Sequence, residues 1–263
     1  MHVVLDRFPA DLNLGPTWQT FVKGGGALEA TGETLRLINT DTVSSQYTNA
    51  QIDDYQRLPR RDFLWRPPLT LTVEARFSHP AGVLQGTAGF GFWNDPFLMT
   101  GLRRPALPQV IWFFYSSPPS NMKLDWQTPS HGWKAGTLDA LRWPFFALLP
   151  TAPLAIPLMK IDLLYRLCWP LGQRAIGVSE ALVPVAMPEW HSYTIRWQKQ
   201  GAQFLVDDRL ILETPTSPAG PLGFVLWLDN QYAIVTPWGR FGYGLLAAPG
   251  QQWLEVKRLE ISA

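Results

Sequence analysis

The chain has 263 residues, a formal net charge of +1 and only 16% charged residues, with acidic and basic side chains interspersed. A nucleic-acid partner would require a clustered basic face, so we expect no nucleic acid to bind. Thirteen tryptophans and 24 prolines indicate a loop-rich β protein, and all-β chains of this length commonly form one domain, so 1–263 is treated as a single domain.

The single cysteine and the N-terminal residues are informative about the cellular compartment of the protein. A chain of this length can bury enough apolar surface to fold without disulfides. Cys168 lies in an apolar stretch, where we expect it to be buried. The first residues lack the basic region followed by an apolar region that is typical of a secretion signal, so the expected location is cytoplasmic.

Strand patterns dominate the chain. Residues 69–79 (LTLTVEARFSH) alternate strictly between apolar and polar side chains, which indicates a strand with one buried face. Residues 86–95 (GTAGFGFWND) predict a strand in which two glycines remove bulk from one face. Further strands are predicted at 110–117, 192–197, 202–206, 210–214, 222–230 and 253–262. Short strands between Gly, Pro, Asn and Asp turns favour a jelly-roll sandwich of two antiparallel sheets.

Residues 138–188 break the strand pattern and predict a mostly helical, apolar insertion. Within it, residues 158–171 have helical spacing, with one stripe formed by Leu158, Ile161, Tyr165 and Cys168. No charge occurs from residue 143 to residue 159, but four prolines there would break a transmembrane helix repeatedly. We expect the insertion to pack on the sandwich, and a lid or a membrane-surface patch is the alternative.

Four stretches follow one another in an order found in a known family. They are YTNAQI (47–52), LTVEARFSHPAG with the following GFGFW, EWHSYTIRWQKQGAQFLVDDRLI (189–211) and the closing WLEVKRLEI. This order resembles the concanavalin A-like jelly rolls, especially the family 16 glycoside hydrolases, over most of the chain outside 138–188. The resemblance implies an all-β, concanavalin A-like sandwich of two antiparallel sheets, with the helical insertion added.

The resemblance does not extend to the catalytic motif of that family. Those hydrolases carry Glu-x-Asp-x-x-Glu on the strand after the aromatic one, where alternation places the acids on the concave face. The matching segment here, PQVIWFFYSSPP (108–119), contains no Asp or Glu, and the motif occurs nowhere else in the chain. We therefore do not expect a retaining glycoside hydrolase, and whether the protein is an enzyme stays open.

The apolar strand at 110–117 has two faces. Val110, Trp112, Phe114 and Ser116 share one, and Ile111, Phe113 and Tyr115 share the other. One set must pack between the sheets, and the other then lines the concave face. The sequence leaves open which set takes which place.

Acidic residues at strand ends are candidate catalytic groups. Asp229 follows a strand rich in Trp and Leu, where loss of water would raise its pKa. Asp53 and Asp54 stand next to Tyr55, just after the strand that borders the cleft in the relatives. Because Asx residues at strand ends are also ordinary turn formers, each has a structural alternative. The candidate catalytic residues are Asp229, Asp54, Asp53 and Tyr55.

Aromatic side chains are the most abundant signal for a binding site. Aromatic rings stack on sugars, line apolar pockets and stabilise cations, but each could equally fill the core. The candidate ligand-binding residues are Trp93, Trp112, Phe114, Trp227, Tyr232, Trp238, Asn230 and Gln231. The histidines lack metal-ligand spacing, so we expect no metal site and no cofactor. A structural calcium on the convex side could use Asp6 or Asp207, but nothing in the sequence requires it.

Three functions from different classes are consistent with these patterns. The first is binding of a small apolar or isoprenoid-like ligand in an aromatic cleft, with an acid/base reaction such as isomerisation, cyclisation or hydration. The second is a non-catalytic glycan-binding module derived from a glycoside hydrolase. The third is a protein or membrane-surface interaction domain that makes peripheral contact through the apolar insertion.

Overall fold

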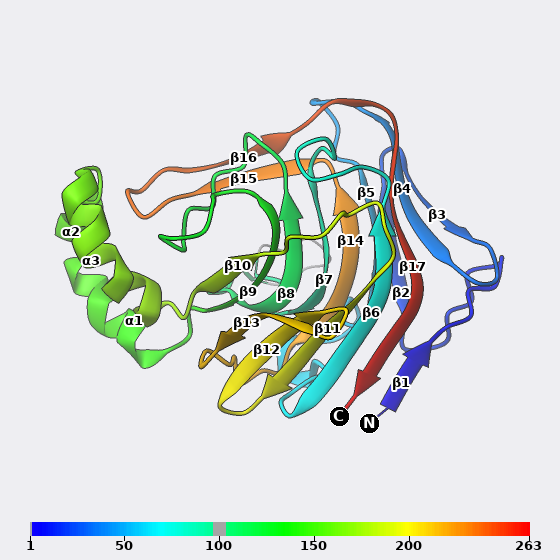
Figure 1. Ribbon diagram of the computed structural model, residues 1–263, viewed down its shortest axis with the longest axis horizontal. Coiled ribbons are helices and arrows are strands. Elements are labelled where there is room, and N and C mark those ends of the chain that lie inside the picture. Colours follow the sequence, from blue (N-terminus) through cyan, green and yellow to red (C-terminus); the bar gives the residue numbers. More distant parts are fainter. Residues whose placement is uncertain (1, 97–103) are drawn as a thin grey trace.

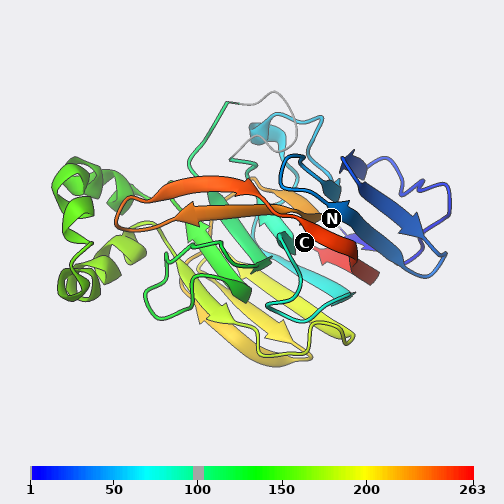
Figure 2. The same ribbon diagram turned by 90° about the horizontal axis from the view of Figure 1, so that it is seen from above.

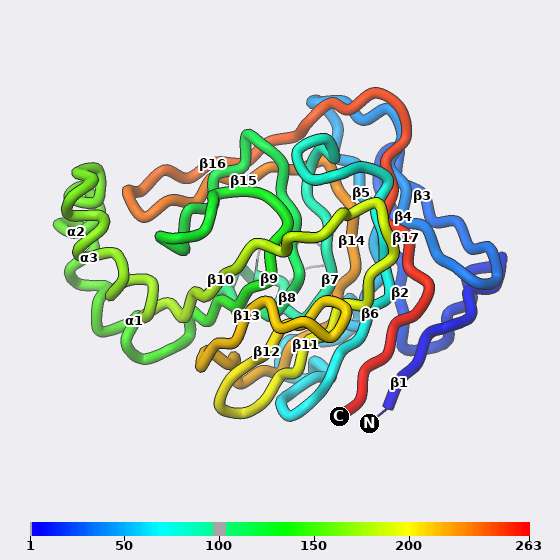
Figure 3. The backbone as a smooth tube through the Cα atoms, viewed as in Figure 1, coloured from blue at the N-terminus to red at the C-terminus, as the bar shows by residue number. Residues whose placement is uncertain are grey.

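The computed structural model describes residues 2–96 and 104–263, and most of its strands belong to two large antiparallel sheets (Figure 1). The eight-stranded sheet has the strand order β13 (Arg209–Thr214), β12 (Gly201–Val206), β11 (His191–Gln198), β6 (Leu69–Phe77), β17 (Ala248–Ser262), β4 (Leu35–Thr42) and β3 (Gly26–Ala30), and β1 (His2–Leu5) also pairs with β17. The β1–β17 pairing brings the two ends of the chain side by side (Figure 3).

The second sheet has seven strands and carries the aromatic segments. Its order is β10 (Ser179–Leu182), β9 (Gly132–Asp139), β8 (Gln109–Ser116), β7 (Thr87–Trp93), β14 (Gly223–Asp229), β5 (Asn49–Asp53) and β2 (Gln19–Lys23). A separate hairpin of β15 (Gln231–Val235) and β16 (Phe241–Leu245) follows β14, and a 3₁₀ turn, η1 (Arg60–Asp62), precedes β6. All the strands predicted from the sequence are present, so the expected sandwich of two antiparallel sheets is confirmed.

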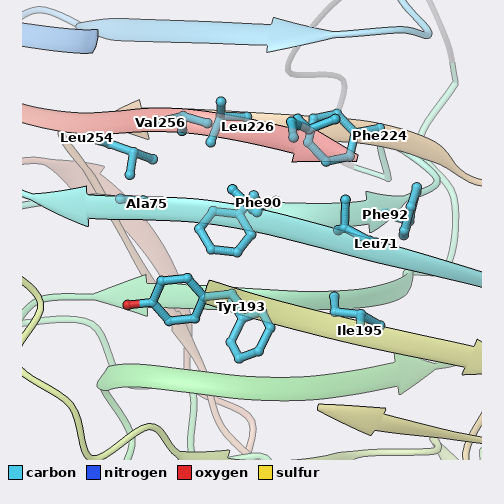
Figure 4. Packing of buried hydrophobic residues seen from close by; sticks show 14 of the residues in the cluster. Leu71, Ala75, Phe90, Phe92, Tyr193, Ile195, Phe224, Leu226, Leu254 and Val256 are labelled. Carbon is cyan, nitrogen blue, oxygen red and sulfur yellow. The ribbon is translucent and has the colours of Figure 1, made fainter. Parts of the chain in front are cut away.

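The main core lies between the two sheets. Side chains alternate along each strand, and one of the two sets points into this layer. Along β6 every second residue from Leu69 to Phe77 is buried, as the period of two predicts. Side chains of β6, β7, β11, β14 and β17 meet in this layer (Figure 4). Phe113 lies among aromatic neighbours here, with its ring centroid 5.2 Å from that of Tyr193 and 5.5 Å from that of Phe204.

The two faces of β8 lie in different environments. Ile111, Phe113 and Tyr115 are buried in the core between the sheets. Trp112 and Phe114 point to the opposite side, away from the eight-stranded sheet, where their partners across the ladder are Gly91 and Gly89 of β7. The seven-stranded sheet therefore has aromatic side chains on both faces.

The insertion is helical over a shorter range than 138–188. Its helices are α1 (Trp143–Leu148), the 3₁₀ turn η2 (Leu149–Thr151), α2 (Ala152–Leu158) and α3 (Asp162–Ala175). Residues 138–139 belong instead to β9, and residues 179–182 form β10, both of which are strands of the seven-stranded sheet. The first helical segments are short because Pro144, Pro150 and Pro153 begin new turns and Pro157 lies inside α2. None of the helices in the described chain is long and apolar enough to cross a membrane.

The predicted packing of this segment is partly wrong. Of the proposed stripe only Tyr165 is buried, whereas Leu158 and Ile161 are exposed. Cys168, expected to be buried, is also exposed. The helix attaches through a different face, because Trp169 Nε1 donates to Leu124 O at 2.7 Å and Gln173 Nε2 donates to Asp125 Oδ2 at 2.6 Å. Polar contacts to one loop, together with the packing of Tyr165 on Trp238, hold α3.

Candidate ligand-binding pocket

An aromatic cluster covers the outer face of the seven-stranded sheet. The cluster is formed by Trp93 of β7, Trp112 and Phe114 of β8, and Trp227 of β14, each of which contacts at least two of the others. The rings of Trp93 and Trp227 are parallel within 2° at 6.4 Å between centroids, and those of Trp112 and Phe114 stack at 4.9 Å. These rings form the floor of a pocket with a volume of about 220 Å³.

Glycines on β7 provide the space in which these large rings lie across the sheet. A Cβ atom on Gly91 would lie 2.6 Å from Cα and Cβ of Trp112, and one on Gly89 would lie 3.0 Å from Cη2 of Trp227. Cβ atoms do not approach other atoms this closely, so a larger residue at Gly91 would force the β8 backbone that carries Trp112 to shift. The two glycines noted in the sequence are therefore part of the pocket floor.

The walls of the pocket come from segments far apart in the chain. Tyr232, Ala233 and Val235 of β15 form one wall, and Met122 and Leu124 of the loop after β8 form another. The loop and the hairpin are joined by backbone hydrogen bonds. Asn121 N donates to Ala233 O at 2.9 Å, and Val235 N donates to Asn121 O at 2.9 Å. Further apolar lining residues are Pro108, Val110, Leu138 and Val225.

Asp229 is a carboxyl group at the margin of this apolar pocket. Its Oδ1 accepts hydrogen bonds from Thr87 N, from Thr87 Oγ1 at 2.8 Å and from Gln231 N at 3.0 Å. Thr87 Oγ1 in turn accepts from Trp227 Nε1 at 2.9 Å. Within the described chain, no hydrogen bond is recorded to Oδ2 of Asp229. Burial raises the pKa of Asp229 to about 6, although these hydrogen bonds act in the opposite direction.

A buried ion pair lies at another side of the pocket. Lys134 of β9 donates from Nζ to Glu180 Oε2 of β10 at 2.8 Å, and Glu180 lines the pocket. Burial raises the pKa of Glu180, while the Lys134 ammonium opposes the change. Neither residue was predicted from the sequence. Glu180 fell inside the predicted insertion, and Gly132 and Gly136 weakened the strand pattern around Lys134.

The pocket collects most of the predicted binding residues. Of the candidates named from the sequence, the lining includes Trp93, Trp112, Phe114, Trp227, Tyr232, Gln231 and Asp229. They come from β7, β8, β14 and β15. Gln51 of β5 and Thr87 of β7 also line it and were not predicted. Gln51 lies opposite Trp227 on one side of β14, and Thr87 lies opposite Asp229 on the other side. Both positions depend on strand pairing, which the sequence does not specify.

Three of the candidate catalytic residues, Asp53, Asp54 and Tyr55, lie outside the pocket lining. Asp54 points into the core, where Oδ1 accepts from Phe224 N at 2.9 Å and Oδ2 accepts from the indole of Trp65. Burial raises its pKa to about 7. Asp53 closes the turn after β5, accepting from the backbone N of Tyr55 at 3.2 Å, and Tyr55 packs beneath Trp93. These contacts fit structural roles for all three.

Two predicted ligand-binding residues also lie elsewhere. The amide of Asn230 joins neighbouring loops, since Oδ1 accepts from Thr48 N at 2.9 Å and Nδ2 donates to Leu246 O at 3.0 Å. Trp238 packs edge-on against Tyr165 of α3 at 5.6 Å between ring centroids. The sequence indicated Asn230 by its position at a strand end and Trp238 as an aromatic residue bordering the concave face, but the loops turn both side chains away from the pocket. In residues 2–96 and 104–263, no cluster of three or more potential metal ligands occurs.

Comparison with known proteins supports the fold and does not give a family. No protein-family profile matches the sequence, and no curated protein matches it. Solved structures do resemble the fold. One is the GlcNAcα1-4Gal-releasing endo-β-galactosidase from Clostridium perfringens, with a TM-score of 0.54 and 11% identity over 99% of this chain. This chain spans 60% of that protein's chain.

Two further structures are similar at a TM-score of 0.50. A lichenase (β-1,3-1,4-glucanase) derived from a mouse hindgut metagenome has 11% identity, with 99% of this chain and 98% of the other covered. The Crh5 transglycosylase in complex with NAG has 12% identity, with 99% and 83% covered. At such low identity the likeness concerns the fold alone. It confirms the expected resemblance of this fold to the jelly rolls of family 16 glycoside hydrolases.

Proposed function

We propose that this protein binds a small, predominantly apolar molecule in the aromatic pocket, with Asp229 as the acidic group that meets it. The observation that carries the proposal is the floor of four contacting rings, formed by Trp93, Trp112, Phe114 and Trp227. Apolar surface removed from water in such a pocket contributes about 25 cal/mol per Å² to binding. A ligand with a flat or branched hydrocarbon skeleton fits this lining best.

Asp229 supports a non-hydrolytic acid/base reaction on that ligand. A carboxyl group with a pKa of about 6 can both hold and release a proton near neutral pH. Its Oδ1 is fixed by Thr87 and Gln231, so Oδ2 is the oxygen available to a bound molecule. Proton transfer of this kind is what isomerisation, cyclisation and hydration require.

Glycan binding is the second candidate, and the fold favours it. The three solved structures with a similar fold are named as an endo-β-galactosidase, a lichenase and a transglycosylase. Against this candidate, sugars need donors and acceptors on several edges, whereas several of the polar lining groups are already engaged. Gln51 Nε2 donates to Asp53 Oδ2 at 2.7 Å, and Thr87 donates to Asp229. An apolar ligand requires fewer new polar contacts.

Binding measurements separate the two candidates. The probes are the apolar dye N-phenyl-1-naphthylamine, followed by fluorescence, and laminari-oligosaccharides, followed by calorimetry. We expect the dye to bind and Trp112→Ala to weaken it by roughly tenfold, because one aromatic wall is removed. Trp143→Ala, which removes an exposed indole outside the pocket, is the matched control. Binding of the oligosaccharide but not of the dye, with the same dependence on Trp112, would establish the glycan candidate instead.

A charged probe tests the role of Asp229. A quaternary trimethylammonium derivative of the same naphthyl dye has no titrating group of its own. Its affinity should rise severalfold as the pH passes through about 6, because Asp229 becomes ionised. The neutral dye should show no such rise, and Asp229→Asn should abolish it. If the pH dependence survives in Asp229→Asn, Asp229 is not the group that meets the ligand.

A further inference from the structure

The largest group of exposed apolar side chains lies on the helical segment, which we call the helical lobe (residues 141–175). Of 22 large hydrophobic residues exposed in the described part of the chain, twelve lie within it. Trp143 is 78% exposed and Leu154 is 72% exposed. The others are Leu141, Phe146, Leu148, Leu149, Ile156, Leu158, Ile161, Leu163, Leu167 and Leu171. Soluble surfaces rarely gather so many large apolar groups without a binding role.

The exposed leucines of α3 lie opposite its attachment to the rest of the protein. Tyr165, Trp169 and Gln173 are spaced four residues apart and form the attached face. Leu163, Leu167 and Leu171 have the same spacing two residues earlier, about 200° around the helix. These three leucines are 64–66% exposed. Figures 1 and 2 show the lobe projecting beyond the sandwich.

The β15–β16 hairpin extends the apolar surface beside the lobe. Its end reaches the helices (Figure 2), where Trp238 packs on Tyr165 and a Cβ on Gly239 would lie 2.7 Å from Cγ2 of Ile156. On β16, Phe241 is 74% exposed and Tyr243 is 86% exposed. Exposed aromatic residues next to apolar helices are typical of proteins that bind at the interface between lipid and water.

The charges of the lobe are predominantly basic. The lobe contains Arg142, Lys160, Arg166 and Arg174, and its only acidic residue is Asp162. Asp162 is paired with Arg166, with 3.0 Å between Oδ2 and Nε. No charged residue occurs from residue 143 to residue 159. This arrangement of an uncharged apolar segment flanked by basic residues is complementary to anionic phospholipid headgroups above an apolar layer.

We propose that the helical lobe inserts into one face of an anionic phospholipid bilayer without crossing it. The exposed apolar side chains come from three short helices and surround the lobe, which projects from the sandwich. A fluid bilayer surface can cover all sides of such a projection, whereas a protein partner or a second copy of this chain would need a matching cavity. The helices are too short to span the bilayer, so insertion is limited to its surface.

This docking does not depend on the proposed function, but it places the pocket near the lipid. Trp169 of α3 bonds to the backbone of Leu124, and Leu124 lines the pocket. Trp238, at the end of the hairpin that forms another wall, contacts Tyr165. The inserted lobe would therefore hold both pocket walls next to the membrane surface, where apolar molecules are concentrated.

The test uses Cys168, the chain's only cysteine, which is exposed on α3. The protein labelled there with a nitrobenzoxadiazole fluorophore is mixed with vesicles of phosphatidylcholine, with and without phosphatidylglycerol. We expect a blue shift and increased emission with the anionic vesicles, co-sedimentation with them, and weaker binding at high salt. No emission change with anionic vesicles, or equal affinity for both vesicle types, would overturn the proposal.

Two double variants identify the surface that is responsible. Leu163→Glu with Leu167→Glu should weaken vesicle binding by on the order of 100-fold, because two inserted leucines become charged. The matched control, Val22→Glu with Val83→Glu, changes exposed valines of the sandwich and should bind like the unchanged protein. If the lobe variant binds vesicles normally, the proposal fails. It also fails if the unchanged protein self-associates without binding vesicles and the lobe variant is monomeric, which would assign the lobe to a second copy.

Discussion

The pocket and the helical lobe are both rich in large apolar side chains, but only the pocket covers them. Trp93 and Trp227 are 7% exposed because neighbouring strands, the hairpin and a loop surround them. Leu163 and Leu167 are 65% and 66% exposed because α3 has contacts on its opposite side only. Sheet pairing supplies several neighbours to each side chain, whereas short proline-interrupted helices supply few. Apolar composition alone therefore does not tell a core from a binding surface.

The largest expected difference concerns stability. Phe113→Ala empties a site at the centre of the aromatic core, so it should lower the free energy of unfolding by about 3 to 5 kcal/mol. Phe146→Ala removes the same side chain from the lobe, where it is 47% exposed, and should cost less than about 1 kcal/mol. Denaturant titration of both variants measures the two values. Similar losses would show that the lobe is packed as tightly as the sandwich.

The second prediction concerns pH. Burial raises the folded-state pKa of Asp229 from 3.8 to about 6, so the folded protein holds this proton more tightly than the unfolded chain does. The free energy of unfolding should therefore fall as the pH rises from about 4 to 6. Asp229→Asn removes this contribution, and its stability relative to the unchanged protein should increase by on the order of 3 kcal/mol over that range.

The control for this pH experiment lies in the lobe. Asp162→Asn changes an exposed acid whose partner, Arg166, is exposed as well. Because exposed ion pairs contribute little, its stability difference should stay within about 0.5 kcal/mol at every pH. Chemical denaturation at pH 4, 5, 6 and 7 measures both variants. A difference for Asp229→Asn that does not change with pH would contradict the prediction.

The third prediction tests the glycine on the pocket floor. Gly91→Ala places a methyl group against Trp112 on a backbone with φ of 150°, so it should destabilise the protein by about 1 to 3 kcal/mol and weaken dye binding. Gly242→Ala in the exposed hairpin is the control, because its methyl group would meet only Ile234 at 3.8 Å. Thermal unfolding with and without the dye measures both effects. An unchanged Tm for Gly91→Ala would show that the backbone of β8 beside Gly91 can shift without cost.

The smallest effect is expected for Leu167→Ala. The side chain is 66% exposed and alanine is a good helix former, so the free energy of unfolding should change by less than about 0.5 kcal/mol. The matched control is Leu71→Ala in the core, which should cost about 2 to 5 kcal/mol. A loss of several kcal/mol at Leu167 would mean that the lobe is covered in solution, by a second copy or by the sandwich itself.

Much of the fold could be predicted from the sequence. The alternation along residues 69–79 and 110–117 gave each strand and the two sets of side chains on it, because successive residues of a strand point to opposite faces. The order of strand motifs gave the type of sandwich. Strands with weaker patterns were missed, including β9, whose glycines interrupt the alternation, and β10, which lies at the end of the apolar insertion.

The candidate site could be predicted only in part. Trp93, Trp112, Phe114, Trp227 and Asp229 stand out by composition and by their place on predicted strands, and they do line one pocket. The Lys134–Glu180 pair could not be predicted, because it depends on the pairing of β9 with β10.

The sequence by itself determined the strands, their alternating faces and the absence of acidic residues from β8, since these follow from local chain geometry and residue identity. Only the tertiary structure decided that Phe113 is core and Phe114 is pocket, that Asp54 is enclosed while Asp229 borders the cavity, and that the leucines of α3 face outward. The reason is physical. Which side of a strand or helix loses its water depends on the segments that pack against it, and those segments come from distant parts of the chain.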